Sequence, residues 1–139
     1  MTREWSAIAI FCEDIREEKS RQDTLIGILP DTLRVPSIPG MMPKLAVYAR
    51  IHVLRIAGIR EVRIRCELLD GTVVQANDLT EVLAQEKGKG ESIGLVAKTV
   101  FSPFPVMAAG QIKVIATIDG EDYVCGALTI VADEQQPEA

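Results

Sequence analysis

The stretch Glu61-Val62-Arg63-Ile64-Arg65-Cys66-Glu67-Leu68 alternates strictly between charged and apolar side chains. Successive side chains of a β-strand point to opposite faces, so this period of two places Val62, Ile64, Cys66 and Leu68 on one face and the charges on the other. The sequence therefore predicts a half-buried strand over residues 61–68, with its apolar face toward a core and its charged face toward water.

Six other segments of the chain carry strand signals of the same kind. Some alternate apolar and polar side chains, others are short runs rich in β-branched residues, and Asp119-Gly120 is a common hairpin turn between two of them. The seven predicted strands cover residues 5–12, 24–29, 45–53, 61–68, 93–101, 112–118 and 123–131. Short strands at this spacing predict a mainly β chain folded as an antiparallel β-sandwich, similar in general plan to the immunoglobulin and C2 architectures.

Two proline-rich stretches interrupt the strand pattern. Residues 35–43 contain three prolines and cannot pair as a central strand, and residues 102–105 form a second break. We expect the first stretch to be a loop that crosses the molecule. Its Met41 and Met42 would either anchor the loop or form an exposed apolar patch for interaction.

Two further segments depart from the strand pattern. Leu79, Val82 and Leu83 follow helical spacing, so we expect at most one short helix, near residues 78–87. Residues 13–23 are rich in both acidic and basic side chains. This composition is typical of a solvated connection, and we expect a charged loop between two strands there.

The totals of the chain limit its class. Its 139 residues are the usual size of one domain, which we assign to residues 1–132, followed by a polar tail at 133–139 that we expect to be frayed. Lys and Arg number 15 against 20 Asp and Glu, and the resulting net charge of -5 disfavours nucleic acid as a partner. No apolar run has the length of a membrane span and the N-terminus has no signal-peptide core, so we expect a cytoplasmic protein without a membrane partner.

The residues that commonly hold metals are few and scattered. Cys12, Cys66 and Cys125 lie singly in apolar surroundings, and the one histidine, His52, has the outward strand parity that Cys66 lacks. We expect reduced, buried thiols and predict no metal site. The glycines of residues 88–94 match neither a dinucleotide fingerprint nor a phosphate loop, so we predict no cofactor.

The pentapeptide Gly90-Glu91-Ser92-Ile93-Gly94 matches the G-x-S-x-G pattern that presents a nucleophilic serine in hydrolases. That pattern requires a turn from a strand into a helix, whereas here it leads into a predicted strand. His52 also precedes Ser92, the reverse of the order in that fold. We therefore predict no catalytic residue.

A polar face could form around Tyr48, Arg50 and His52 if their strand paired with the one that carries Arg63 and Arg65. Pairing through Ala57-Gly58 allows one register that sets the arginines together, which would favour a bound anion or acidic partner, and another in which Glu67 neutralises them. If the two strands belong to different sheets, no such patch exists. A solvated sheet face is the simpler interpretation.

Four blocks of sequence resemble a known family. They are Phe11-Cys12-Glu13-Asp14-Ile15-Arg16, Thr24-Leu25-Ile26-Gly27-Ile28-Leu29-Pro30, Pro39-Gly40-Met41-Met42-Pro43-Lys44 and Tyr123-Val124-Cys125-Gly126. The blocks are similar to those of a family of uncharacterised bacterial and phage-associated proteins of about this length. The similarity covers nearly the whole chain and implies one domain with a prophage or accessory role. The family has no assigned activity, so the resemblance implies no functional residue.

These observations favour a noncatalytic β-sandwich that acts through protein contacts. Its partner would be another protein or a second copy of itself, bound at the loop with Met41 and Met42 or at an open sheet edge. The alternative is a small-ligand or anion-binding domain that uses the face of Tyr48, Arg50, Arg63 and Arg65, and a hydrolase through Ser92 is the third hypothesis.

Overall fold

The fold is known from a computed structural model that describes residues 4–68 and 71–133. The strands are β1 (Trp5–Glu17), β2 (Asp23–Ile28), β3 (Thr32–Val35), β4 (Gly40–Met42), β5 (Leu45–Leu54), β6 (Val62–Leu68), β7 (Val73–Asp78), β8 (Ser92–Phe101), β9 (Phe104–Val106), β10 (Gly110–Ile118) and β11 (Glu121–Ala132). A 3-10 turn, η1 (Arg55–Ala57), and one short helix, α1 (Thr80–Ala84), complete the described elements. The prediction of a mainly β chain with one short helix is confirmed.

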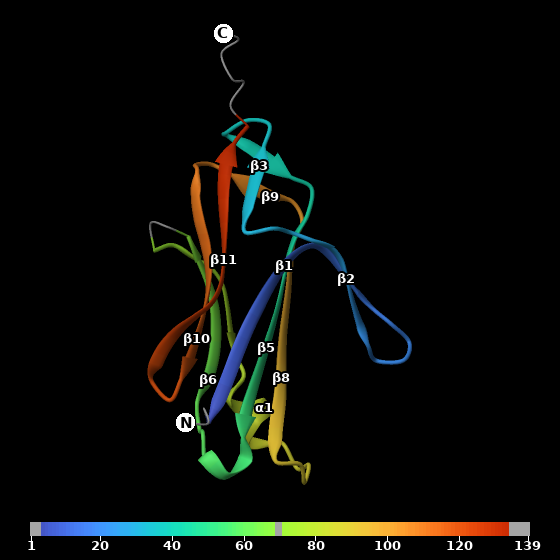
Figure 1. The fold of residues 1–139 in the computed structure, drawn as a ribbon, viewed down its shortest axis with the longest axis vertical. Helices are drawn as coiled ribbons and strands as arrows, with labels where there is room; N and C mark the ends of the chain where they lie inside the picture. The colour runs from blue at the N-terminus through green and yellow to red at the C-terminus, as the bar shows by residue number, and fades with distance from the viewer. Residues whose placement is uncertain (1–3, 69–70, 134–139) are drawn as a thin grey trace.

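The strands form two main sheets and a small ribbon, shown in Figure 1. Sheet A has the strand order β2-β1-β5-β8, and sheet B has the order β3-β11-β10-β6-β7. The ribbon consists of β4 and β9. The pairs are antiparallel except that β3 lies parallel to β11. All seven predicted strands are present.

The core lies between sheets A and B and follows the predicted period of two. Val62, Ile64 and Cys66 of β6 are buried as predicted, while Arg63 points outward. The largest fully buried side chains are Leu45, Ile51, Ile112, Leu128, Val53, Val62, Val114 and Cys12. Both sheets supply this set, so each sheet is held by apolar area that the other removes from water.

The sheets approach each other most closely where β11 passes β1. A Cβ atom at Gly126 would lie 2.8 Å from the backbone oxygen of Ala9 and 2.9 Å from its Cβ. Only a residue without a side chain allows this distance between the two backbones.

The predicted C-terminal hairpin is confirmed. Asp119 and Gly120 have φ values of 47° and 84°, the left-handed conformation that a tight hairpin turn of the type I′ class requires. Asp119 Oδ1 also accepts hydrogen bonds from the N–H groups of Arg60 and Glu61 at 2.9 and 2.8 Å. The turn therefore ties the start of β6 to the β10-β11 hairpin.

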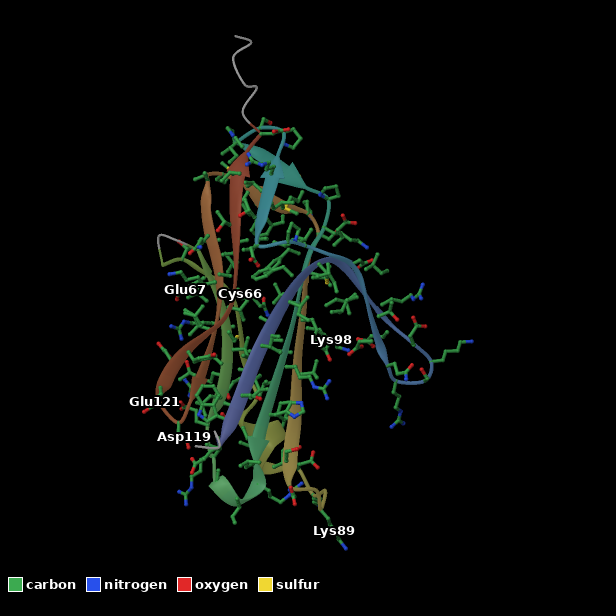
Figure 2. The ribbon with its side chains drawn as sticks, viewed as in Figure 1. Cys66, Glu67, Lys89, Lys98, Asp119 and Glu121 are labelled. Carbon is green, nitrogen blue, oxygen red and sulfur yellow. The ribbon has the colours of Figure 1, made fainter. Side chains whose placement is uncertain are left out.

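The prediction of a charged loop over residues 13–23 is wrong. β1 continues to Glu17 and β2 begins at Asp23, so most of this segment belongs to a β-hairpin. Lys98 Nζ of β8 bonds to Glu17 Oε1 and to Asp23 Oδ1, both at 3.0 Å, and Figure 2 shows Lys98 pointing toward the hairpin. The two carboxylates therefore fix the hairpin to β8 and are not simply exposed to solvent in a loop.

The prediction for the proline-rich stretch 35–43 needs a correction. The stretch does cross from sheet B to sheet A, but Gly40–Met42 within it pairs with Phe104–Val106 at the second proline break. Proline is tolerated there because an isolated two-stranded ribbon has free edges on both sides. β3 and β7 are also strands that the sequence did not predict. The predicted tail, apart from Asp133, lies outside the described residues.

Candidate functional site

The predicted arginine face does not form one patch. β5 pairs with β1 and β8, whereas β6 pairs with β10 and β7. Tyr48, Arg50 and His52 therefore lie on the outer face of sheet A, and Arg63 and Arg65 lie on the outer face of sheet B. The hairpin through Ala57-Gly58 is absent because η1 and Gly58, with φ 67°, carry the chain from one sheet to the other.

The arginines of sheet B are held by neighbouring side chains. Arg65 bonds to Asp122 Oδ2 at 3.0 Å, to Glu67 Oε2 at 3.1 Å and to Thr117 Oγ1 at 3.1 Å. The bond from Arg65 lowers the pKa of Asp122, and the bonds to Asp122 and Glu67 raise the pKa of Arg65. Arg63 has Glu61 and Asp78 at 3.5 Å. Both arginines therefore bond to side chains of the same sheet, which is a structural role.

Arg50 on sheet A has a different environment. Its cross-strand neighbours are Ile8 and Val96, and its Nε donates to His52 Nε2 at 2.8 Å. Among the described residues no carboxylate forms an ion pair with Arg50. Lys98, on the same face, is already bonded to two carboxylates. Of the three polar residues predicted for this face, Arg50 alone is a guanidinium, and it has no carboxylate partner in the described part of the chain; one such group is less than the convergent set of donors that an anion site needs.

Ser92 occupies the first position of β8, opposite Leu54 of β5. The G-x-S-x-G pentapeptide thus leads from a loop into a strand, not from a strand into a helix as in hydrolases. His52 lies opposite Gly94, not Ser92, and its Nε2 accepts a hydrogen bond from Arg50.

The cysteines are free thiols. Cys12 and Cys66 are buried, as predicted, and Cys125 is half-buried. Burial raises the pKa of Cys66 and of Cys125 to about 11, so both are protonated at neutral pH. Within the described ranges, no group of three or more His, Cys, Asp and Glu side chains is placed to hold a metal ion.

The larger of two hollows at the β4-β9 ribbon lies at the end of the molecule where β3 and β9 lie in Figure 1. We call it the Met41 groove, and it has a volume of about 850 Å³. Its lining combines aliphatic side chains and prolines with a short polar rim: Glu13, Asp14, Ile26, Leu33, Val35, Pro36, Ser37, Gly40, Met41, Met42, Pro43, Lys44 and Ser102. Three of the four blocks that resemble the known family contribute to this lining.

The two methionines of the Met41 groove have different environments, and an ion pair crosses its rim. Met41 is 65% exposed, whereas Met42 is partly buried and packs against the core. The two predicted roles of the methionines therefore both occur. Met42 anchors the segment to the core, and Met41 is exposed to solvent. Lys44 Nζ bonds to Asp14 Oδ2 at 3.1 Å across the rim, and this bond lowers the pKa of Asp14.

A second hollow of about 390 Å³ borders β9, the other strand of the ribbon. Its lining is almost entirely apolar and comprises Leu68, Phe104, Pro105, Val106, Met107, Ala108, Ala109, Gly110, Gln111, Ile112 and Ile130. Met107, at its mouth, is 72% exposed. The sequence analysis missed this site, although Met107 follows closely after a proline break just as Met41 follows Pro39.

The fold and these hollows define the chain as a β-sandwich domain with an apolar, methionine-bearing end. Within the described residues no helix is long and apolar enough to cross a membrane. A family model matches residues 7–131, and the chain belongs to this family of unknown function, DUF6941. No curated protein matches the sequence. The predicted relationship to an uncharacterised family is confirmed.

Proposed function

We propose that this protein is a noncatalytic domain that binds a segment of another protein in the Met41 groove. The observation that carries the proposal is the exposed Met41 side chain above an open, largely aliphatic hollow. A methionine side chain is flexible and polarizable, so it adapts to apolar partners of different shape. Exposed apolar surface with a polar rim is typical of protein interaction sites.

The charges at the rim specify the chemistry of the partner. Asp14 is paired with Lys44, whereas Glu13 forms no ion pair with any described residue. A segment with an apolar side chain for the groove and a nearby Lys or Arg for Glu13 would satisfy both features. The net charge of -5 favours such a basic segment at longer range.

The free thiols also support the location that the sequence suggested. Cys12, Cys66 and Cys125 form no disulfide, a state typical of reducing compartments. We therefore extend the proposal to a cytoplasmic protein of bacterial or phage context, in keeping with the resemblance described above.

A random peptide library tests the proposed binding. Selected peptides should carry an apolar residue close to Lys or Arg, and Met41→Asp should weaken their binding by roughly tenfold, because it places a charge in the groove. Ile56→Asp is the matched control, since Ile56 is 93% exposed in η1, far from the groove in the fold. Selection of no peptide, or equal weakening by both variants, would overturn the proposal.

A further inference from the structure

Strand β8 has one side without a neighbour. It is the last strand of sheet A and runs for 10 residues, Ser92–Phe101, beside β5 without a register shift. Strand edges present backbone N–H and C=O groups that can pair with another strand, and proteins usually protect them.

The ends of the β5-β8 ladder show which backbone groups are unpaired. Arg55 N–H donates to Glu91 O at 2.8 Å, so this pair is a hydrogen-bonded one. Hydrogen-bonded and non-hydrogen-bonded pairs alternate in an antiparallel ladder, and the odd-numbered residues of β8 therefore bond to β5. The even-numbered residues point their N–H and C=O groups to the free side. They are Ser92, Gly94, Val96, Lys98 and Val100.

The strands at the other ends of sheets A and B are protected, although β1 before Phe11 and β11 before Thr129 also have no paired strand on one side. β7 has 6 residues, and its pairing with β6 shifts register between Cys66 and Glu67. β3 has 4 residues and lies between Pro30 and Pro36. β2 has 6 residues and contains Gly27 in the left-handed conformation, with φ 66°. Short strands, bulges, prolines and kinks each hinder edge pairing, and β8 contains none of these devices.

The charge on β8 does not protect it either. Lys98 is the one charged residue of this strand, and a lysine on an edge usually repels an incoming strand. Its ammonium group, however, is bonded to Glu17 and Asp23 of the β1-β2 hairpin. Glu17 and Asp23 therefore both fix the hairpin and keep the Lys98 ammonium group paired, and the three groups together carry a net negative charge.

We propose that β8 pairs with β8 of a second copy of this chain, antiparallel and across a two-fold axis at Val96. This register pairs all five even-numbered residues and gives about ten backbone hydrogen bonds. It sets Lys98 opposite Gly94 of the second copy, where no side chain competes for space. A register centred on Lys98 would instead place two lysines opposite each other, each with its two bonded carboxylates, and groups of like net charge directly opposite each other destabilise a sheet.

The outer face of sheet A supports a second copy rather than an unrelated strand. Ile8 and Val96 flank Arg50 on one cross-strand row, and both aliphatic side chains are exposed. In the Val96-centred register the two valines meet, so the rows of both copies join into one stripe from Ile8 to Ile8. Each copy thereby covers the exposed Val96 side chain of the other.

Sedimentation equilibrium over about 1 to 500 μM tests the proposal. The wild type should form dimers, and Val96→Pro should be monomeric, because proline removes an N–H group at the free side and none that bonds to β5. Ala76→Pro is the matched control. By the same alternation its N–H points to the free side of β7, since Leu79 N–H bonds to Val62 O, and it should dimerise like the wild type.

Gly94 variants test the register even if Val96→Pro fails to fold. Gly94→Glu sets a further carboxylate opposite the group of Lys98, Glu17 and Asp23 in the second copy, which already carries a net negative charge, and should weaken the dimer roughly three- to tenfold, whereas Gly94→Lys should tighten it by a similar factor. A Cβ at Gly94 approaches nothing closer than 3.8 Å, so the fold accepts both. A strictly monomeric wild type, a dimer that persists in Val96→Pro, or equal affinities of the Gly94 variants would overturn the proposal.

Discussion

The arginines on the outer faces of the two sheets have different bonding partners. On sheet B, Arg65 is held by two carboxylates and a hydroxyl group. On sheet A, Arg50 lies between Ile8 and Val96, and among the described residues its side chain bonds only to His52. Sheet B pairs Arg63 and Arg65 with carboxylates of the chain, whereas on sheet A Arg50 has no carboxylate partner among the described residues and lies between exposed aliphatic side chains.

The edges of the sheets differ in the same way. β7 of sheet B is short and bulged, while β8 of sheet A is long and regular. The arginines of sheet B are paired within the chain and its edge strand β7 is short and bulged, so neither feature requires a partner. We propose that partners bind at the open edge of sheet A and at the Met41 groove beside its β1-β2 hairpin.

The largest expected effect lies in the interior, where the two sheets should behave alike. Leu45 of sheet A and Leu128 of sheet B are fully buried, so Leu45→Ala and Leu128→Ala should each lower the free energy of unfolding by about 2–5 kcal/mol. Urea denaturation measures both. A loss below about 1 kcal/mol at either position would show that the two sheets do not share one core.

The next effect concerns the contact between the sheets. Gly126→Ala should lower the free energy of unfolding by about 1–3 kcal/mol, because the new methyl group would meet the backbone of Ala9. Gly94→Ala is the control, since its methyl group has room and should change stability by less than about 0.5 kcal/mol. Similar losses for the two variants would contradict the close approach of β11 to β1.

The arginines give a smaller and unequal effect. Arg65→Gln should lower Tm by roughly 2–4 °C, because it breaks bonds to Asp122, Glu67 and Thr117 together. Arg50→Gln should change Tm by less than about 1 °C, since it loses one bond at an exposed site. Thermal denaturation of the two variants measures both changes. A larger loss of Tm in Arg50→Gln than in Arg65→Gln would contradict the difference between the two faces.

The smallest effect is a pH dependence that comes from carboxylates with partners. The hydrogen bond from Arg65 holds the pKa of Asp122 below its ordinary value of 3.8. The folded state therefore binds this proton less readily than the unfolded state, so the stabilisation is present above pH 3.8 and is lost as the pH falls through the lowered pKa. Tm should fall less steeply below about pH 4 in Asp122→Asn than in the wild type. Parallel curves for Tm against pH would contradict this assignment.

Strand faces could be predicted from the sequence, whereas the pairing of strands could not. The alternation of Val62, Ile64 and Cys66 with arginines reports which side chains meet the core, because parity is a local property. It contains no information on which sheet a strand joins. The expected patch of Arg50 with Arg63 failed for this reason, since a 3-10 turn, not a hairpin, follows β5.

The candidate site shows the same limit. Met41 could be singled out from the sequence, because it belongs to an apolar pair within a proline-rich stretch that cannot be a central strand. Its groove could not, since Asp14, Ile26 and Ser102 reach it from segments far apart in the chain. β4 and β9 were missed because both are very short and their pairing depends on a distant partner rather than on local pattern.

Backbone amide hydrogen exchange, followed residue by residue at low and high protein concentration, tests the contrast between the sheets most directly. Ala97 and Thr99, which bond to β5, should exchange slowly at both concentrations. Val96 should exchange rapidly in dilute solution and slowly in concentrated solution, whereas Ala76 of β7 should exchange rapidly in both. Exchange at Val96 that matches Ala97, or that does not depend on concentration, would contradict an open β8 edge that pairs with a second copy.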